Sequence, residues 1–398
     1  MSFKNFRFIV LLLTPVLVVL FFYFKYKIGN PRPIFLPAPD VTKLIDENNQ
    51  SVDSPFTLPP NLKIGIFAKD LGNVRDLEIS PSGIVLASIT GAGKVIALAD
   101  KDNDGKADQV KDVLTGLNRP HGLAFYLDKL YVVEETRVVR YYWDKDSLSA
   151  TPDKFLFSLP TGGGHFTRSI VFDNKGTMYV SIGSSCDSCF ENHEWLGAVV
   201  SSDVDGNNPK LYAKGLRNTT FLTVNPITQT VWATEMGRDF LGDSLPPDEI
   251  NILKLGDFGW PVCYGDKTHD SSFDPEKKYA DRCRQSIAPI YNICAHCAPL
   301  GLAFINSPKL PQAWQGDLLV ALHGSWNSSK PVGYKVIRLD VEDEEVVGEE
   351  DFLTGFLQSE ELRPDQTLGR PVDLVFNKNG DLLISDDKAG VIYRVSTE

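Results

Sequence analysis

The sequence has no cluster of basic residues and no excess of positive charge. Its 398 residues carry a formal net charge of −12, and the lysines and arginines are scattered along the chain. A negative surface repels phosphate backbones, so nucleic acid is not expected as a partner. The chain also lacks a glycine-rich strand–turn–helix fingerprint, which argues against a nicotinamide-dependent enzyme.

Turn-forming residues, in contrast, are plentiful. The chain contains 31 glycines and 25 prolines, while 42% of its residues are hydrophobic. This composition is typical of a chain that forms a core and turns often, and it excludes both a disordered chain and a bundle of long helices. The length suits one large closed β-domain as well as two average domains.

The N-terminus carries a long apolar run. It extends from Phe8 to Phe24 without a charge, and basic residues flank it on both sides. Such a run is close to the minimum that spans a bilayer core. It is followed by no small-x-small cleavage site and no cysteine placed for lipid attachment, so we favour an uncleaved anchor over a signal peptide. We predict a membrane anchor over residues 1–27 and an extended proline-rich linker over residues 28–60.

The six cysteines allow two interpretations. An even number of cysteines behind an export signal favours disulfides. The alternative is a zinc site built from the two C-x-x-C pairs, a spacing that metal sites also use. Oxidised cysteines would place the domain in a periplasmic or extracellular space, with the N-terminus inside. The cysteines fall as Cys186 with Cys189, Cys263 with Cys283, and Cys294 with Cys297.

One phrase recurs six times along the chain. It consists of an apolar strand, a turn with Gly or Asn, and a second apolar strand that ends in small or acidic residues. The first intervals are about 44 to 50 residues, the length of a four-stranded propeller blade. We therefore predict an all-β, six-bladed β-propeller over residues 61–398, in which residues 62–71 pair with the last blade and close the ring. The copies begin near Leu77, His121, Arg168, Asn218, Leu300 and Pro371.

Eight short phrases follow one another along this region. They are Gly116-Leu-Asn-Arg-Pro-His-Gly-Leu-Ala124, Gly183-Ser-Ser-Cys186, Gly215-Leu-Arg-Asn218, Asp248-Glu-Ile-Asn251, Gly259-Trp-Pro261, Leu322-His-Gly-Ser-Trp-Asn327, Gly333-Tyr-Lys335 and Gly369-Arg-Pro-Val-Asp373. Taken together in this order, they resemble the glucose/sorbosone dehydrogenases that use pyrroloquinoline quinone (PQQ). The similarity covers residues 60–396 and looks closest to the sorbosone dehydrogenase branch.

The resemblance implies an oxidoreductase that acts on a sugar or a sugar-derived aldehyde. Hydride would pass to PQQ, and an acceptor that the sequence does not identify would reoxidise the cofactor. The resemblance makes His121 the general base, and imidazole suits that task because its pKa lies near neutral pH. It places Arg217 and Asn218 beside the quinone oxygens, and Lys335 and Arg370 on the cofactor carboxylates.

A calcium ion that polarises the quinone is a further implication of the resemblance. Backbone carbonyls would hold it, at positions that map to Gly237 and Arg238. Met236 and Arg238 differ from the residues of the glucose-specific branch. Because carbonyl groups do the ligating, we expect that the site survives these differences.

A second calcium site is indicated by spacing alone. Oxygen-bearing side chains occupy positions 1, 3, 5 and 9 of an acidic loop, and Gly105 occupies position 6. Position 12 is Lys111 instead of the usual bidentate glutamate, so an unmetallated acidic turn is the alternative. We predict a structural calcium ion held by Asp100, Asp102, Asp104 and Asp108.

Two other functions compete with the dehydrogenase. A propeller without catalytic activity would bind glycans or proteins at the cell surface, because fold does not fix function. A calcium-dependent lactonase would use a similar propeller. Neither function requires the three cations Arg217, Lys335 and Arg370 around one mouth, so these residues favour the dehydrogenase.

Overall fold

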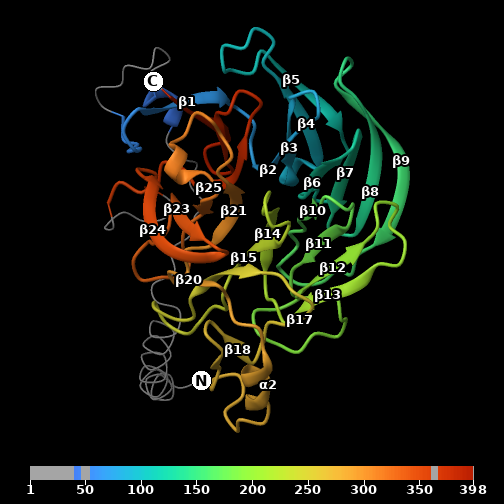
Figure 1. Cartoon of the computed structure of the whole chain (residues 1–398), viewed down its shortest axis with the longest axis vertical. Helices are drawn as coiled ribbons and strands as arrows, with labels where there is room; N and C mark the ends of the chain where they lie inside the picture. The colour runs from blue at the N-terminus through green and yellow to red at the C-terminus, as the bar shows by residue number, and fades with distance from the viewer. Residues whose placement is uncertain (1–39, 46–53, 360–365, 398) are drawn as a thin grey trace, which may run out of the picture.

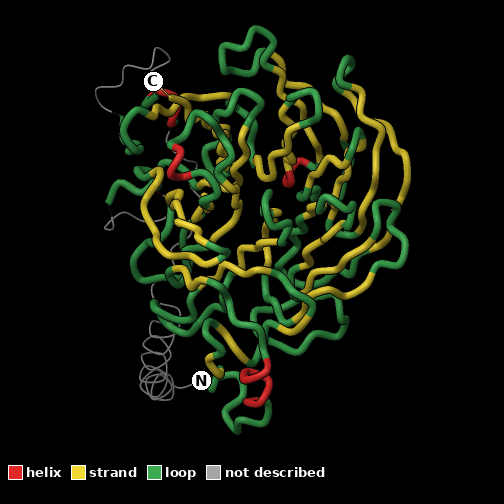
Figure 2. The backbone as a smooth tube through the Cα atoms, viewed as in Figure 1, coloured by secondary structure: helices red, strands yellow, loops and turns green. Residues whose placement is uncertain are grey.

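The computed structural model describes residues 40–45, 54–359 and 366–397. Strands dominate this part of the chain, and its helices are short (Figure 2). The strands form blades around a common centre (Figure 1). Each blade is a mainly antiparallel sheet, and most of its strands follow one another in chain order. The predicted all-β, six-bladed propeller is therefore confirmed.

The first three blades follow the chain without a large insertion. The first contains β2 (Val74–Ile79), β3 (Val85–Ile89), β4 (Lys94–Ala99) and β5 (Gln109–Leu114). The second contains β6 (Leu123–Tyr126), β7 (Lys129–Glu134), β8 (Arg137–Asp144) and β9 (Ser149–Ser158). The third contains β10 (Ile170–Phe172), β11 (Met178–Ile182), β12 (Ala198–Ser202) and β13 (Lys210–Lys214), and the short β17 (Gly256–Asp257) joins its edge in parallel.

The last three blades complete the ring. The fourth contains β14 (Thr219–Val224), β15 (Val231–Glu235), β16 (Asp248–Ile252) and β20 (Tyr291–Ile293). The fifth contains β21 (Pro299–Phe304), β22 (Leu318–Leu322), β23 (Lys335–Glu342) and β24 (Glu345–Leu353). The sixth contains β25 (Pro371–Phe376), β26 (Leu382–Asp386), β27 (Val391–Thr397) and the N-terminal β1 (Leu62–Ala68). This pairing of β1 with β27 confirms the predicted closure.

Burial explains why the second strand of a blade is so apolar. All five residues of β3 and of β22 are buried, because neighbouring blades cover both faces of a central strand. The outermost strands β9 and β24 instead carry many exposed residues. The central strands are therefore mainly apolar, whereas the outermost strands mix apolar residues with polar, exposed ones.

Buried polar groups tie the blades together near the axis. The first strands of successive blades contact one another around the ring. Asp373 in the sixth blade accepts the backbone N–H of Leu77 in the first, at 2.7 Å. Asp76 accepts the N–H of Leu123 in the second blade, at 3.2 Å. These bonds satisfy backbone groups that blade packing would otherwise leave buried without partners.

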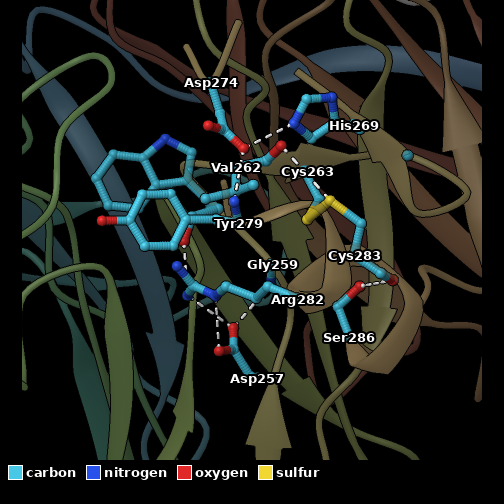
Figure 3. Close-up of a disulfide and its surroundings, with 12 residues drawn as sticks. Asp257, Gly259, Val262, Cys263, His269, Asp274, Tyr279, Arg282, Cys283 and Ser286 are labelled. Atoms are coloured by element: carbon cyan, nitrogen blue, oxygen red, sulfur yellow. Dashed lines mark hydrogen bonds and ion pairs between the residues drawn. A yellow bond between two sulfur atoms is a disulfide. The ribbon is translucent and has the colours of Figure 1, made fainter. Parts of the chain in front are cut away.

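An insertion follows the fourth blade's third strand. It holds β18 (Cys263–Tyr264), β19 (Thr268–His269) and α2 (Ala280–Gln285), and it projects at the lower edge of Figure 1. A disulfide between Cys263 and Cys283 joins α2 to β18 (Figure 3). His269 lies 3.0 Å from Asp274, whose carboxylate also accepts the N–H of Tyr279. The insertion thus has a cross-link and hydrogen bonds of its own.

All six cysteines are disulfide-bonded. Cys186 pairs with Cys189, Cys263 with Cys283, and Cys294 with Cys297. The zinc interpretation of the two C-x-x-C pairs is therefore wrong. Each of these pairs instead closes a short ring in a loop next to the propeller mouth.

The N-terminal segment packs more closely than its prolines predict. Val41, in the short helix η1 (Val41–Lys43), is buried, and so are Ile45 and Phe56. These side chains join the core cluster of the fifth and sixth blades. The described residues of the predicted linker thus lie against the domain instead of forming a free spacer. The other short helices are η2 (Thr90–Ala92) and η3 (Gln312–Trp314).

The predicted membrane anchor lies outside the described residues. Within residues 40–45, 54–359 and 366–397 no helix is both long enough and apolar enough to cross a bilayer. The anchor at Phe8 to Phe24 stays a prediction.

Candidate functional site

His121 lies at the inner end of the second blade, before β6. Its side chain is completely buried, and its Nδ1 lies 3.0 Å from the carbonyl oxygen of Arg168. A carbonyl only accepts hydrogen bonds, so the proton belongs on Nδ1 and Nε2 keeps its lone pair. Nε2 has no hydrogen-bond partner among the residues that the structure describes. His121 is thus an oriented, buried imidazole whose Nε2 lone pair has no partner in the described part of the chain.

Local sequence explains how His121 reaches this position. A side chain at Gly122 would place its Cβ atom 2.7 Å from the Arg168 carbonyl oxygen. Only glycine allows the two blades to approach so closely. Burial, followed by the nearby charge of Arg75, lowers the pKa of His121 to about 3. The imidazole is therefore neutral at physiological pH, as a proton acceptor must be.

A second cluster lies beside His121 and joins the first, fifth and sixth blades. Arg75 forms an ion pair with Asp387 at 2.7 Å, and the other oxygen of Asp387 lies 2.9 Å from Nε2 of His323. Burial would raise the pKa of Asp387, but His323 and Arg75 hold it well below its usual range. Burial, with a contribution from the nearby Arg370, lowers the pKa of His323 to about 4.

Arg370 completes this cluster. Its Nε donates to the carbonyl oxygen of His323 at 2.9 Å, and its Nη2 donates to that of Gly324 at 2.5 Å. The guanidinium also lies over the ring of Tyr334, 5.6 Å from the centroid. Burial lowers the pKa of Arg370. Arg75 and Arg370 thus both lie near Asp387, and the charge of Asp386 also acts on Arg370.

Arg217 belongs to a separate, acidic part of the mouth. Its Nη2 lies 2.8 Å from Asp187 and 3.0 Å from Asp239. Asn327 of the fifth blade donates to the other oxygen of Asp239 at 2.6 Å. Burial raises the pKa of Asp239, Arg217 opposes the change, and the charge of Asp187 adds to it. The structure thus places Arg217 between two carboxylates from different loops.

Glu235 fixes the turn that carries Arg217 and Asn218. One of its carboxylate oxygens accepts the backbone N–H of Arg217 at 2.7 Å and that of Asn218 at 2.6 Å. The hydroxyl of Thr219 donates to the other oxygen. Burial raises the pKa of Glu235 to about 7. This carboxylate at the end of β15 therefore fixes the backbone positions of both predicted site residues.

Lys335 lies apart from the other predicted cations. Its ammonium group is 2.5 Å from Asp351 on the outer strand β24, and both side chains are partly exposed. Within the described residues, no hydrogen bond or ion pair joins it to Arg217 or Arg370. Its role on a cofactor carboxylate stays a prediction, whereas Arg217 and Arg370 do lie at the mouth.

The predicted calcium position at Gly237 and Arg238 lies next to Arg217. The N–H of Gly237 donates to Asp248 at 2.8 Å, and Arg238 forms an ion pair with Asp270 at 2.7 Å. Burial raises the pKa of Asp248 to about 7. Arginine side chains already neutralise carboxylates here, so a bound cation would share its negative partners with them. The metal site at these carbonyls stays a prediction.

The acidic loop brings three of its four aspartates together. Carboxylate oxygens of Asp100, Asp102 and Asp108 all lie within 4.8 Å of one another. Asp104 instead caps its own turn by accepting the N–H of Lys106 at 2.7 Å. One oxygen of Asp100 is buried and unpaired within the described part of the chain. These oxygens fit a hard cation such as calcium.

Sequence reasoning missed Arg75, His323 and Asp387, although a signal for the first was present. Arg75 and His121 both lie two residues before a buried aliphatic residue of an inner strand, namely Leu77 and Leu123. Comparing this position across the repeats identifies a ring of side chains near the axis. His323 lies within the phrase Leu322-His-Gly-Ser-Trp-Asn327, and Asp387 is the final residue of the sixth copy of the repeat.

Comparisons with known proteins agree with the propeller fold. A family model described as TrAA12-like matches residues 56–398. An uncharacterized protein of Borreliella burgdorferi is 28% identical over 366 residues, which is 88% of this chain and 93% of the relative. The holo PQQ domain of a pyranose dehydrogenase from Coprinopsis cinerea has a TM-score of 0.73 at 19% identity, over 86% of this chain and 97% of that domain.

A second solved structure supports the same fold. The calcium structure of a Trichoderma reesei carbohydrate-active enzyme of family AA12 also has a TM-score of 0.73, at 18% identity, and it covers 93% of this chain and all (100%) of the other. The predicted sorbosone dehydrogenase branch is not confirmed, because the family model that matches is described as TrAA12-like. Since that model spans residues 56–398, the protein belongs to the TrAA12-like family.

Proposed function

We propose that this protein is a quinoprotein oxidoreductase that oxidises a hydroxyl or hemiacetal group of a sugar or a sugar-derived aldehyde. One observation carries the proposal. The unpaired Nε2 of the oriented His121 lies near Arg75, and Arg75 and Arg370 are two nearly buried guanidinium groups close to Asp387. Guanidinium groups bind carboxylates well, so two of them close together suit an anionic ligand next to a base.

PQQ fits these residues because it carries three carboxylates and a quinone. Arg75 and Arg370 would hold carboxylates, and Arg217 and Asn218 would face the quinone oxygens. Bound at this site, PQQ would accept the hydride that leaves the substrate carbon. The pyranose dehydrogenase domain named above is described as a PQQ domain, which supports this choice of cofactor.

The chain's own contribution to the chemistry is a proton transfer. Nε2 of His121 takes the proton from the substrate hydroxyl while the C–H bond breaks. The bond from Nδ1 to the Arg168 carbonyl keeps the imidazole in the required tautomer, and it stabilises the imidazolium that forms. Arg217, held by Asp187 and Asp239, faces the region where negative charge develops.

Reconstitution tests this function directly. The full chain, purified without cofactor, is titrated with PQQ and calcium and then screened by dye reduction over aldoses and sugar-derived aldehydes. The proposal expects a saturable change in quinone absorbance and a turnover that requires the quinone. A folded protein that binds no quinone would instead support a non-catalytic surface propeller or a lactonase.

The acidic loop gives a separate expectation for stability. We propose that Asp100, Asp102 and Asp108 hold a structural calcium ion, so calcium at a hundredfold excess over Kd should add roughly 2.7 kcal/mol to the free energy of unfolding. Asp102→Asn should reduce the calcium-induced rise in Tm. Asp104→Asn is the matched control and should reduce it less, because Asp104 does not join the oxygen cluster. A Tm of the parent protein that does not change when calcium is added would contradict this site.

We also propose that the catalytic domain lies outside the cytoplasm, tethered by an anchor within residues 1–27. The three disulfides support an oxidising compartment. A cysteine-reactive, membrane-impermeant label applied to intact cells should modify a cysteine placed at Asp128, in the turn between β6 and β7. Labelling only after cell lysis would contradict this orientation.

A further inference from the structure

A small disulfide ring lies directly behind Arg217. Cys186 and Cys189 are bonded to each other and enclose Asp187 and Ser188. Nε of Arg217 donates to the backbone carbonyl oxygen of Asp187 at 3.0 Å, and Nη2 donates to its carboxylate at 2.8 Å. One residue of the ring therefore offers Arg217 acceptors from both its backbone and its side chain.

Asp187 also links three parts of the mouth. Its carboxylate accepts the backbone N–H of Asp239 at 2.7 Å, and its carbonyl oxygen accepts the indole N–H of Trp260 at 3.2 Å. The side chain of Arg217 is only 5% exposed, so these contacts decide its direction. Moving the Asp187 backbone would displace the guanidinium of Arg217.

The ring is anchored to the third blade next to it. The hydroxyl of Ser184 donates to the carbonyl oxygen of Cys186 at 2.7 Å. Beside it, the N–H of Ser185 donates to Glu191 at 2.6 Å. A four-residue covalent ring removes most of the backbone freedom of the two residues that it encloses. Asp187 is thus restrained on both sides before any ligand binds.

We propose that the Cys186–Cys189 ring is a positioning element that holds Asp187, and through it Arg217, in the orientation used to bind the quinone. This inference rests on the proposed function, in which Arg217 faces the quinone oxygens. With the ring open, Arg217 still has Asp239 as a partner at 3.0 Å. The expected consequence is therefore a misplaced cation in a domain that still folds.

The Cys263–Cys283 disulfide provides a matched control. It lies in the insertion, between β18 and α2 (Figure 3), and its cysteines are separated by 20 residues instead of 3. In the chain-entropy description, a disulfide that closes a longer loop stabilises the fold more. If disulfides only stabilised this protein, the control variant would therefore lose more in both Tm and quinone affinity.

The first measurement needs no quinone. In the cofactor-free full chain, the Arg217 Nε–H should give a side-chain nitrogen NMR signal protected from solvent exchange, assigned by its loss in Arg217→Lys. We expect Cys186→Ser/Cys189→Ser to lose this protection and Cys263→Ser/Cys283→Ser to keep it. A protected, unshifted signal in the open-ring variant would overturn the proposal, whatever the protein binds.

The second measurement is the quinone Kd, followed by absorbance or by tryptophan fluorescence. Opening the Cys186–Cys189 ring should raise Kd about tenfold or more, whereas the control should stay within about twofold of the parent. Asp187→Ala keeps the ring intact and should also raise Kd, which covers the case of an open-ring variant that fails to fold. Parent-like affinity in both variants would overturn the positioning role alone, whereas a parent that binds no quinone would overturn the proposed function.

Discussion

Replacement of His121 with alanine is expected to lower turnover by roughly 10²–10⁴-fold, the usual contribution of a positioned general base. Quinone binding should be retained, because the cations Arg75 and Arg370 do not donate to His121 in the structure. The measurement is steady-state dye reduction at saturating quinone, with quinone affinity determined in parallel. The loss should appear in kcat and not mainly in KM.

His269→Ala is a suitable control for this prediction. His269 also contacts a carboxylate, Asp274, but it lies in the insertion. Its removal should leave kcat nearly unchanged. A fully active His121→Ala variant would leave the proposed enzyme activity standing, but it would show that another group is the general base.

The same histidine predicts the acid side of the pH profile. Burial lowers its pKa to about 3, so its neutral form, which accepts the proton, persists as pH falls from 7 to 5. Protonation would remove the lone pair only near pH 3. We therefore expect no acid limb from His121 between pH 5 and 7 in kcat/KM. An acid limb near pH 6.5 that disappears in the His121 variant would contradict this assignment.

Arg217→Ala is expected to have a much larger effect than Lys335→Ala. Removal of Arg217 leaves Asp187 and Asp239 facing each other without their shared cation. We expect a loss of roughly 2–3 kcal/mol in the free energy of unfolding, below the 3–5 kcal/mol of a fully buried pair because Asp187 is partly exposed. Lys335 pairs with a more exposed carboxylate, so its removal should cost less than about 1 kcal/mol.

Denaturant unfolding of the cofactor-free protein measures the stability part of this prediction, and quinone titration measures the binding part. Arg217→Ala should weaken quinone binding strongly, since it removes charge-assisted hydrogen bonds. Arg217→Lys should recover part of the stability and less of the binding, because an ammonium group lacks the planar fork. Equal losses of affinity for Arg217→Ala and Lys335→Ala would place Lys335 on the cofactor as well.

The insertion after the fourth blade's third strand shows which features the sequence predicts and which only the structure reveals. The sequence indicates a long interval between the fourth and fifth copies of the repeat, and it contains Cys263 and Cys283. It does not reveal that Arg282 of this insertion donates to Asp257 on the edge of the third blade. That contact depends on how the inserted loop folds back, and no local pattern encodes it.

Lys335 and Arg75 also show what the sequence leaves open. The phrase Gly333-Tyr-Lys335 identifies Lys335, but the partner of its long side chain depends on the neighbouring strand, which supplies Asp351. Arg75 and Asp387 lie 312 residues apart in the chain and meet only because the ring closes. Charge-pair partners at this distance cannot be derived from spacing.

The sequence by itself determined the number of blades, their closure by the N-terminal strand and the position of His121, because strand alternation and turn residues act over a few neighbouring positions. It left open whether the cysteines bind zinc or form disulfides. Only the tertiary structure decided that pairing, and only it gathered Arg75, His323, Arg370 and Asp387 into one cluster and placed Asp187 behind Arg217. The physical reason is that blade packing around a closed ring brings together the ends of strands that lie far apart in the chain.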